Sequence, residues 1–238
     1  MNTNYQHQIT IFVNKYKILK REIIQTKDGS TTIFFPEINE TYHSKFGAIQ
    51  EAYHVFIKMG FETQTQESLS ILEVGFGTGL NAFITFLEAK KTNKIINYVG
   101  VDAYPVSLNE ISKMNFVTHL DAISDENVFN SMHNSIWNEK IVLSKNFVLT
   151  KRQQFFQEIN DINSFDLIYF DAFGYRIEPE LWSIEIFKKM YDALKPQGVL
   201  VTYACRSSIK NDMIALGFEV EKLPGAPGKR EMLRATKV

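Results

Sequence analysis

The strongest constraint on the fold of this chain lies at residues 71–81, which read ILEVGFGTGLN. Residues 71–74 predict a buried strand, and residues 80–87 carry apolar side chains at helical spacing. Three glycines at every second position turn the backbone between these two segments. A strand, a tight glycine turn and a helix together predict the nucleotide-binding turn of a doubly wound α/β sheet.

The spacing of the glycines indicates which nucleotide this turn suits. A dinucleotide site uses G-x-G-x-x-G, but here the third glycine, Gly79, comes one residue early and Leu80 fills the expected position. Glu73, at the end of the strand, is a carboxylate that an anionic pyrophosphate cannot use and that the amino group of a sulfonium cofactor can. The pattern therefore predicts an S-adenosylmethionine site around Gly75, Gly77 and Gly79.

Length and composition narrow the class of protein. The 238 residues suit one large domain, or a domain with a small appendage. A single cysteine excludes a disulfide framework, and no apolar run is long enough for a signal peptide or a membrane span, so we expect a cytoplasmic protein with no membrane partner. The net charge of −1 argues against bulk coating of nucleic acid, but leaves two local basic clusters, near residues 15–21 and 222–237.

From residue 69 onward the sequence alternates between strand and helix patterns, which predicts a mostly parallel sheet. Strands are predicted near residues 69–74, 95–102, 146–150, 165–170 and 197–204. Helices are predicted near residues 79–90, 106–116, 153–160, 180–194 and 207–216. A last pair of strands, near 218–222 and 230–236, is joined by a loop that suits a hairpin, so the final strand should run antiparallel.

Two further segments flank this pattern. Residues 8–36 alternate apolar and polar side chains around Asp28-Gly29, a strong hairpin signal, and predict two or three short strands followed by a helix at 45–59. Residues 117–145 are interpreted as an insertion with one or two helices and a short strand. His43 and His54 have no cysteine or third histidine nearby, so no metal site is predicted.

Candidate site residues are expected beyond the carboxyl ends of the parallel strands, where such sheets bind their ligands. Asp102 and Ala103 follow the second strand, and a carboxylate there can accept hydrogen bonds from both ribose hydroxyls, with capping of the next helix as the structural alternative. Asp171 follows a strand that should be buried on both faces, so its carboxylate is suited to orient a nucleophile or accept a proton. Phe173 is positioned either to stack on a base or to pack in the core.

Four sequence blocks match one known family. In chain order they are Tyr42-His43-Ser44 with Gly47, Glu51, Tyr53, Val55 and Phe56; GFGTGLN at 75–81; Asp171-Ala172-Phe173 with Pro179 and Trp182; and GKREML at 228–233. Through these blocks the chain resembles the bacterial tRNA methyltransferases that complete 5-methylaminomethyl-(2-thio)uridine, namely the MnmC methyltransferase domain and its stand-alone form MnmD. The full GFGTGLN with KREML is far more specific than a glycine motif alone.

This resemblance implies a Rossmann-like, class I S-adenosylmethionine-dependent methyltransferase. Residues 1–60 would form a β extension and helix packed on a methyltransferase domain at residues 61–238. The implied reaction methylates the primary amine of 5-aminomethyl-(2-thio)uridine at position 34, in the anticodon loop of tRNA. Asp171 would orient the amine or receive its proton, and Phe173 would cover the uracil. The implied cofactor-binding residues are Tyr42, Glu73, Gly75, Gly77, Gly79, Asn81, Asp102, Ala103, Gln153 and Asp171. The implied tRNA-binding residues are Ser44, Phe173, Lys229, Arg230 and Arg234.

The sequence departs from the fused form of the family in three respects. That form has glutamate where this chain has Asp102, and either residue can hold a ribose. It has an acidic residue after the third strand, where this chain has Lys151-Arg152, so Gln153 is predicted to contact the adenine instead. We also expect no flavin-dependent oxidase domain, since 238 residues leave no room for one.

Three other functions stay open at this point. The chain could be a methyltransferase or aminopropyltransferase that acts on a small amine, which would need no basic surface. It could be a non-catalytic RNA-binding module, although the intact glycine motif, Asp102 and Asp171 argue against that. A dehydrogenase is disfavoured by the glycine spacing.

Overall fold

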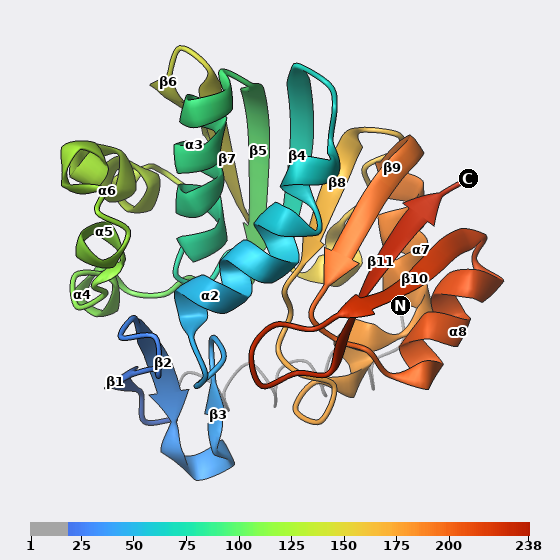
Figure 1. Cartoon of the computed structure of the whole chain (residues 1–238), viewed down its shortest axis with the longest axis horizontal. Coiled ribbons are helices and arrows are strands. Elements are labelled where there is room, and N and C mark those ends of the chain that lie inside the picture. The colour runs from blue at the N-terminus through green and yellow to red at the C-terminus, as the bar shows by residue number, and fades with distance from the viewer. Residues whose placement is uncertain (1–18) are drawn as a thin grey trace.

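The centre of the molecule is one sheet of eight strands (Figure 1), in a computed structural model that describes residues 19–238. The strands lie in the order β10-β11-β9-β8-β4-β5-β7-β6. Their bounds are Ser68–Val74 (β4), Ile95–Asp102 (β5), Lys140–Ser144 (β6), Phe147–Gln153 (β7), Phe165–Phe170 (β8), Leu194–Thr202 (β9), Phe218–Pro224 (β10) and Glu231–Lys237 (β11). The five central strands are parallel, and β11 runs antiparallel to β9. The predicted mostly parallel sheet with an antiparallel last strand is therefore confirmed.

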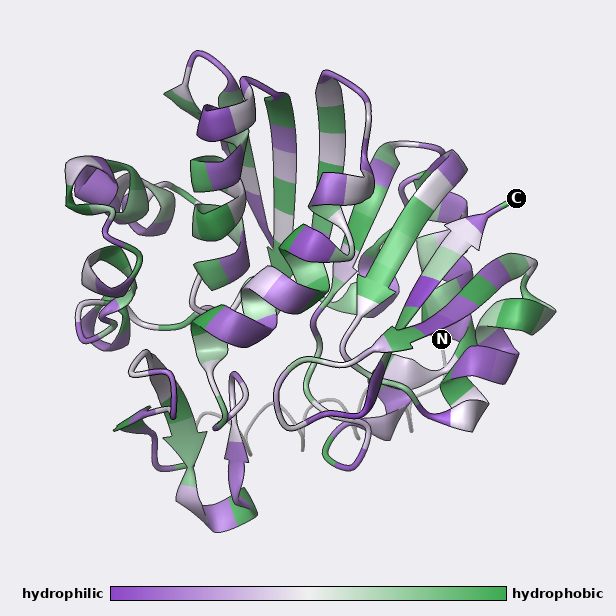
Figure 2. Cartoon of the chain, in the orientation of Figure 1, coloured by the Kyte–Doolittle hydropathy of each residue, from purple (hydrophilic) through white to green (hydrophobic). Residues whose placement is uncertain are grey.

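Helices cover both faces of this sheet. Their bounds are Ala48–Ala52 (α2), Leu80–Thr92 (α3), Leu108–Ile111 (α4), Phe116–His119 (α5), Glu126–Asn134 (α6), Ile184–Ala193 (α7) and Ser207–Ala215 (α8). One hydrophobic cluster joins the sheet to α2, α3 and α6, and a second joins it to α7 and α8. β8, which lies between the two clusters, is hydrophobic along most of its length (Figure 2). Within residues 19–238 no helix has the length and apolar character that a membrane crossing requires.

A small antiparallel sheet precedes the central one, as the sequence predicts. It contains β1 (Glu22–Gln25), β2 (Thr31–Phe35) and β3 (Glu40–Thr41). The turn between β1 and β2 is held by Asp28, whose Oδ1 accepts hydrogen bonds from the Ser30 amide (3.1 Å) and the Thr26 hydroxyl (2.6 Å). In Figure 1 this sheet lies below the carboxyl ends of the central strands. It therefore stands where a parallel sheet binds its ligands.

Part of the prediction for the N-terminus falls outside the described residues. This applies to the alternating pattern from residue 8 to residue 18 and to Lys15 and Lys17 of the first basic cluster. The division of the chain at residue 60 stays a prediction. The helix before it, α2, shares one hydrophobic cluster with α3, which lies after it.

Two predicted helices are wrong in extent. The segment 106–116 splits into α4 and α5 because Asn115 turns towards the small sheet, where Oδ1 accepts from the Thr31 amide and Nδ2 donates to the Gly29 carbonyl, both at 2.9 Å. The segment 153–160 contains only a 3-10 turn at Phe156–Glu158, since β7 continues to Gln153 instead of ending near residue 150. The second correction also changes which β7 side chains reach the edge of the sheet.

Candidate active site

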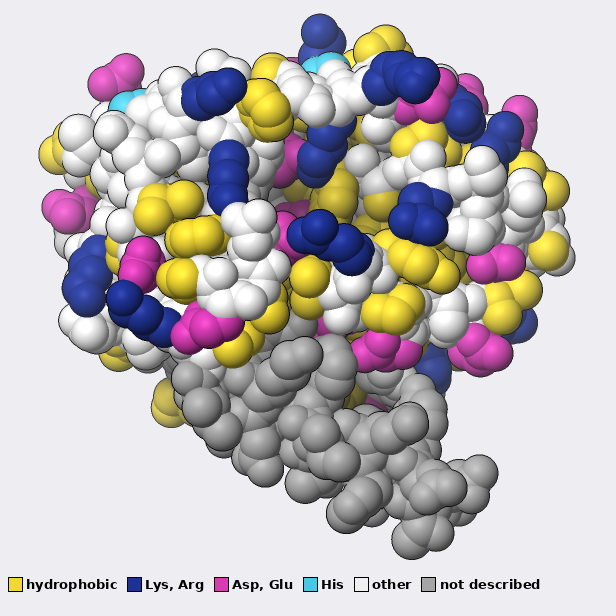
Figure 3. Space-filling model, turned by 90° about the horizontal axis from the view of Figure 1, so that it is seen from below, with side chains coloured by type: hydrophobic (Ala, Val, Ile, Leu, Met, Phe, Trp, Pro, Cys, Tyr) yellow, Lys and Arg dark blue, Asp and Glu magenta, His cyan; other side chains and the backbone are white. Residues whose placement is uncertain are grey.

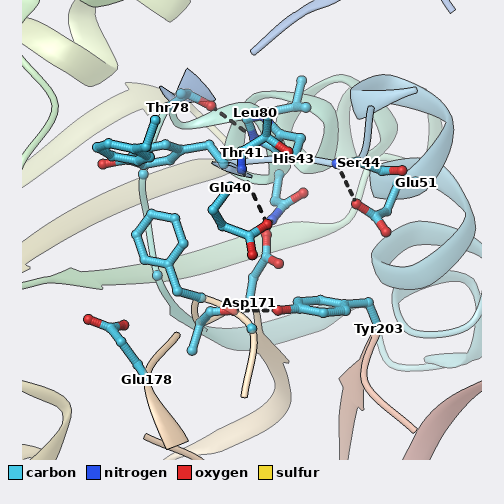
Figure 4. Close-up of a pocket in the computed structure, with 18 of the residues that line it drawn as sticks. Glu40, Thr41, His43, Ser44, Glu51, Thr78, Leu80, Asp171, Glu178 and Tyr203 are labelled. Atoms are coloured by element: carbon cyan, nitrogen blue, oxygen red, sulfur yellow. Dashed lines mark hydrogen bonds between the residues drawn. The ribbon is translucent and has the colours of Figure 1, made fainter. Parts of the chain in front are cut away.

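A cavity of about 480 Å³ opens at the carboxyl ends of β4, β5 and β8 (Figure 4). The small N-terminal sheet, the start of α2 and the loop between β10 and β11 complete its walls. Many of the predicted site residues line it, and these are Tyr42, Ser44, Gly75, Gly77, Asn81, Asp102, Ala103, Asp171, Phe173 and Lys229. The structure therefore brings together residues that lie up to about 190 positions apart in the sequence.

The glycine turn between β4 and α3 gives this cavity a floor made of backbone. Gly75 has φ +98°, and a Cβ there would collide with the carbonyl oxygen of Asp171. Gly77, with φ +50°, lines the cavity without a side chain to fill it. Gly79 is different, because it lies outside the cavity wall and faces His133. Gly79 is needed for its left-handed backbone conformation, with φ +70°, and not because a ligand comes close to it.

Asp102, at the end of β5, faces the cavity beside this turn. Its Oδ2 accepts a hydrogen bond from the Gly77 amide and its Oδ1 accepts one from the Tyr104 amide, both at 2.8 Å. It does not cap the next helix, because α4 begins at Leu108 and is capped by Ser107. Burial raises the pKa of Asp102 above its usual value. Each carboxylate oxygen keeps a second lone pair, so both can still accept from ribose hydroxyls.

A chain of polar side chains runs from the interior to the cavity. Glu73 is fully buried and accepts hydrogen bonds from Asn81 Nδ2 and the Tyr98 hydroxyl, both at 2.9 Å. Asn81 Nδ2 also donates to Asp171 Oδ2 at 2.9 Å. Burial and the Asp171 charge raise the pKa of Glu73 well above its usual value. The predicted contact between Glu73 and a cofactor amino group is therefore not supported, because Glu73 lies behind Asn81 and outside the cavity wall.

Asp171 belongs to an acidic cluster on the other side of the cavity. Burial, followed by the charge of Glu51, raises the pKa of Asp171 to about 7. Glu51 Oε2 accepts a hydrogen bond from the Ser44 amide (3.0 Å), and Glu51 Oε1 forms an ion pair with Lys229. Tyr203 donates its hydroxyl to the Ala172 carbonyl at 2.8 Å. Figure 4 shows Asp171, Glu51 and Tyr203 around the same part of the cavity.

Aromatic side chains form the wall next to this cluster. Phe173 meets the ring of Tyr42 edge-on, with centroids 5.0 Å apart, and Tyr42 stacks on Phe35 at 5.7 Å. Trp182 is buried and donates its indole N–H to the Phe173 carbonyl at 2.7 Å, which holds the loop after β8 in place. Phe173 therefore lines the cavity, whereas Trp182 packs in the core.

The structure leaves several predicted site residues away from the cavity. Gln153 is exposed and does not line the cavity, so the predicted adenine contact is not supported. Lys151, which precedes it in β7, is buried and donates to the His133 carbonyl at 2.9 Å. Arg234 is paired with Glu221 across β10 and β11, with Nε 2.8 Å from the carboxylate. Arg230 is exposed outside the cavity.

Two residues that line the cavity near Asp171, namely Glu51 and Tyr203, were missing from the predicted site, although the sequence holds a signal for each. Glu51 is spaced helically with Ala48, Ala52 and Val55, so it falls on the apolar face of its helix. A carboxylate on such a face is seldom left buried without a function. Tyr203 directly follows β9, at the carboxyl edge of the sheet.

The side chains present fit S-adenosylmethionine. The backbone floor at Gly75 and Gly77 admits close approach of a nucleoside, and Asp102 can hold its ribose. Asn81 Oδ1 is buried without a hydrogen-bond partner among the described residues, and it can accept from the amino group of the cofactor. When bound, the cofactor supplies a methyl group on a positively charged sulfur.

The chain is similar to known proteins in sequence and in fold. Residues 131–238 match the model of a family described as S-adenosyl-L-methionine-dependent methyltransferase. The chain is 29% identical over 212 residues to the "tRNA 5-methylaminomethyl-2-thiouridine biosynthesis bifunctional protein MnmC" of Leptospira borgpetersenii, which covers 82% of this chain and 32% of that protein. It is 25% identical over 236 residues to the protein of the same name from Hydrogenovibrio crunogenus, which covers 91% of this chain and 34% of that protein.

The chain thus spans about a third of the length of these curated relatives. Among solved structures, MnmC2 from Aquifex aeolicus aligns with a TM-score of 0.68 at 22% identity, over 91% of this chain and 70% of that one, and shares its fold. The chain therefore matches a family of S-adenosyl-L-methionine-dependent methyltransferases over residues 131–238, and it is similar over most of its length to part of the MnmC proteins.

Proposed function

We propose that this chain methylates the primary amine of 5-aminomethyl-(2-thio)uridine at wobble position 34 of tRNA. The observation that carries the proposal is the position of Asp171, a half-buried carboxylate that lines the cavity beside the glycine turn, where its surroundings raise its pKa to about 7. The similarity to the MnmC proteins supports the choice of acceptor, since their name gives the biosynthesis of 5-methylaminomethyl-2-thiouridine in tRNA.

The acceptor amine must be neutral before it can act as a nucleophile, and free alkylamines are protonated near pH 7. Asp171 accepts a hydrogen bond from the amine and receives its proton. A base whose pKa lies near the operating pH is effective in both accepting and releasing a proton. Asn81 donates to Asp171 and so keeps one carboxylate oxygen fixed while the other faces the acceptor. Desolvation in the cavity favours the neutral amine.

Phe173 and Tyr42 provide the surface for the base that carries the amine. Their rings line the cavity beside Asp171, and Trp182 fixes the backbone of Phe173. A wobble base lies in a single-stranded loop, so it can be splayed into such a pocket at lower cost than a base in a duplex. Stacking on aromatic side chains is a common way to hold such a base.

Contacts with the tRNA backbone are expected to be few. Figure 3 shows the end of the molecule that carries the small sheet, where the visible basic side chains of residues 19–238 are interspersed with acidic and hydrophobic ones. Of the three basic residues predicted to bind phosphate, Arg230 is exposed, whereas Lys229 and Arg234 are paired with carboxylates. Arg230 is the candidate that remains for a phosphate contact.

A second candidate function is transfer of the methyl group to a small amine. The observation in its favour is the pair of carboxylates at Asp171 and Glu51, which both line the cavity and suit a free cationic amine. Nucleoside mass spectrometry of tRNA from cells that lack this protein separates the two functions. Accumulation of 5-aminomethyl nucleosides supports the tRNA substrate, and an unchanged nucleoside profile rejects it.

A further inference from the structure

The Lys229 ammonium group occupies a small, well-defined part of the cavity. Its Nζ forms an ion pair with Glu51 and lies 3.7 Å from the centroid of the Tyr203 ring. Carboxylate and aromatic face are the two features that recognise an alkylammonium ion. Asp171 lies close enough that Lys229 lowers its pKa while Glu51 raises it. We name the group of Glu51, Asp171 and Tyr203 the amine subsite.

The end of a lysine side chain is a primary alkylamine, as is the aminomethyl group of the proposed acceptor. We propose that Lys229 is a resident occupant of the amine subsite, and that the protonated amine of the substrate displaces it before methylation. This inference rests on the proposed function in one respect, namely that the acceptor is a primary amine. It assigns substrate recognition to Glu51 and Tyr203, in addition to Asp171.

Charge balance explains why the subsite needs an occupant. The side chain of Glu51 is only 11% exposed, and a buried carboxylate without a partner is costly. Lys229 satisfies this charge in the free protein, and an incoming ammonium would satisfy it equally. The exchange therefore keeps the net charge of the subsite constant. A neutral or anionic ligand of the same size could not displace Lys229 without leaving Glu51 unpaired.

The position of Lys229 allows it to leave without moving the core. It lies in the loop between β10 and β11, and its side chain is 31% exposed. The loop itself is held by a hydrogen bond of 2.8 Å from the Lys229 amide to the Ala226 carbonyl. A flexible four-carbon side chain can thus swing into solvent while the backbone stays in place.

Binding of n-butylammonium chloride, measured by calorimetry on the full chain, tests this inference without tRNA. Lys229→Met should bind the probe at least tenfold more tightly than the wild type, since the competing ammonium is gone. The double variants Lys229→Met with Glu51→Gln, and Lys229→Met with Tyr203→Leu, should lose this gain. Lys222→Met is the matched control, because Lys222 lies on the same hairpin but pairs with Glu231 outside the cavity. It should bind the probe as the wild type does.

The inference is overturned if Lys229→Met binds the probe no better than the wild type, or if the double variants keep the gain. Retained S-adenosylmethionine binding and melting temperature show that each variant is folded. Kinetics with the tRNA acceptor separate this inference from the proposed function. If the wild type does not methylate tRNA, the proposed function is refuted but the inference about Lys229 is not. If Lys229→Met instead has a raised KM for tRNA and a weaker salt dependence, Lys229 contacts a phosphate and the inference is overturned.

Discussion

The two halves of the cavity are built in different ways. The cofactor half consists of the turn at residues 75–79 and Asp102, where backbone amides and missing side chains determine the shape. The acceptor half consists of the amine subsite and Lys229, whose side chains come from four segments far apart in the chain. A site for a shared cofactor can be encoded locally, whereas the site for a particular acceptor is assembled by the fold. The two halves should therefore respond differently to substitution.

The largest effect is expected from Asp171→Ala, which should nearly abolish methylation in the acceptor half while cofactor binding in the other half is retained. Methylation should fall by about a thousandfold, since general-base catalysis contributes roughly 10²–10⁴-fold. The affinity for S-adenosylmethionine, measured by calorimetry, should stay within about threefold, because binding of the ribose and backbone does not depend on this carboxylate in our account. Asp166→Ala is the control, since Asp166 lies at the other end of β8 and pairs with Lys195. Full activity in Asp171→Ala would remove Asp171 from the reaction.

Gly75→Ala should affect the cofactor half first. A Cβ at φ +98° is strained and would collide with the Asp171 carbonyl, so the turn must shift. We expect a loss of about a hundredfold in S-adenosylmethionine affinity, which corresponds to about 3 kcal/mol, and a lower melting temperature. Gly174→Ala is the matched control, because a Cβ there would meet its nearest atom, Tyr203 Oη, at an ordinary 3.8 Å. Equal cofactor affinity in the two variants would contradict the assignment of the turn.

The pH dependence of methylation should report on the acceptor half. Because the folded-state pKa of Asp171 is raised to about 7, its base form is lost below that pH. The kcat/KM for the acceptor should fall about fivefold between pH 7 and pH 6 and level off above pH 8. A rate that does not change across this range would show that Asp171 does not titrate there.

The same raised pKa predicts an effect on stability. An acid whose pKa is higher in the folded than in the unfolded state binds a proton more tightly when folded, so its contribution to stability decreases as pH rises from about 4 to about 7. Asp171→Asn removes this half-buried charge. Its melting temperature should exceed that of the wild type by a few degrees at pH 8 and by much less at pH 5. A gain of equal size at both pH values would point to a cause other than titration of Asp171.

The smallest effect is expected from Trp182→Phe, which keeps an aromatic ring but removes the hydrogen bond to the Phe173 carbonyl. A buried hydrogen bond of this kind contributes about 1 kcal/mol, so we expect a rise of about fivefold in the KM for the acceptor. Binding of S-adenosylmethionine should not change, since Trp182 does not line the cavity. A loss of cofactor affinity instead would mean that the two halves are not independent.

The difference between the halves also explains what the sequence could predict. The turn at residues 75–79 and Asp102 follow predicted strands directly, so their place at the edge of the sheet could be inferred from local patterns. The ion pair of Glu51 with Lys229 joins residues 178 positions apart, and no local pattern relates them. Arg234 was predicted to bind tRNA for the same reason, since its pairing with Glu221 depends on the register of β10 and β11, which no local pattern reveals. Gln153 was misplaced because the end of β7 was predicted too early.

The central claim is that a methyl group is transferred to the amine of a wobble uridine. The most direct measurement incubates the purified chain and isotopically labelled S-adenosylmethionine with two acceptors together, namely tRNA from cells that lack the protein and a mixture of small polyamines. The account predicts that the label appears in tRNA and that nuclease digestion releases it as 5-methylaminomethyl nucleosides. Label found only in the small amines, or in neither acceptor, would contradict it.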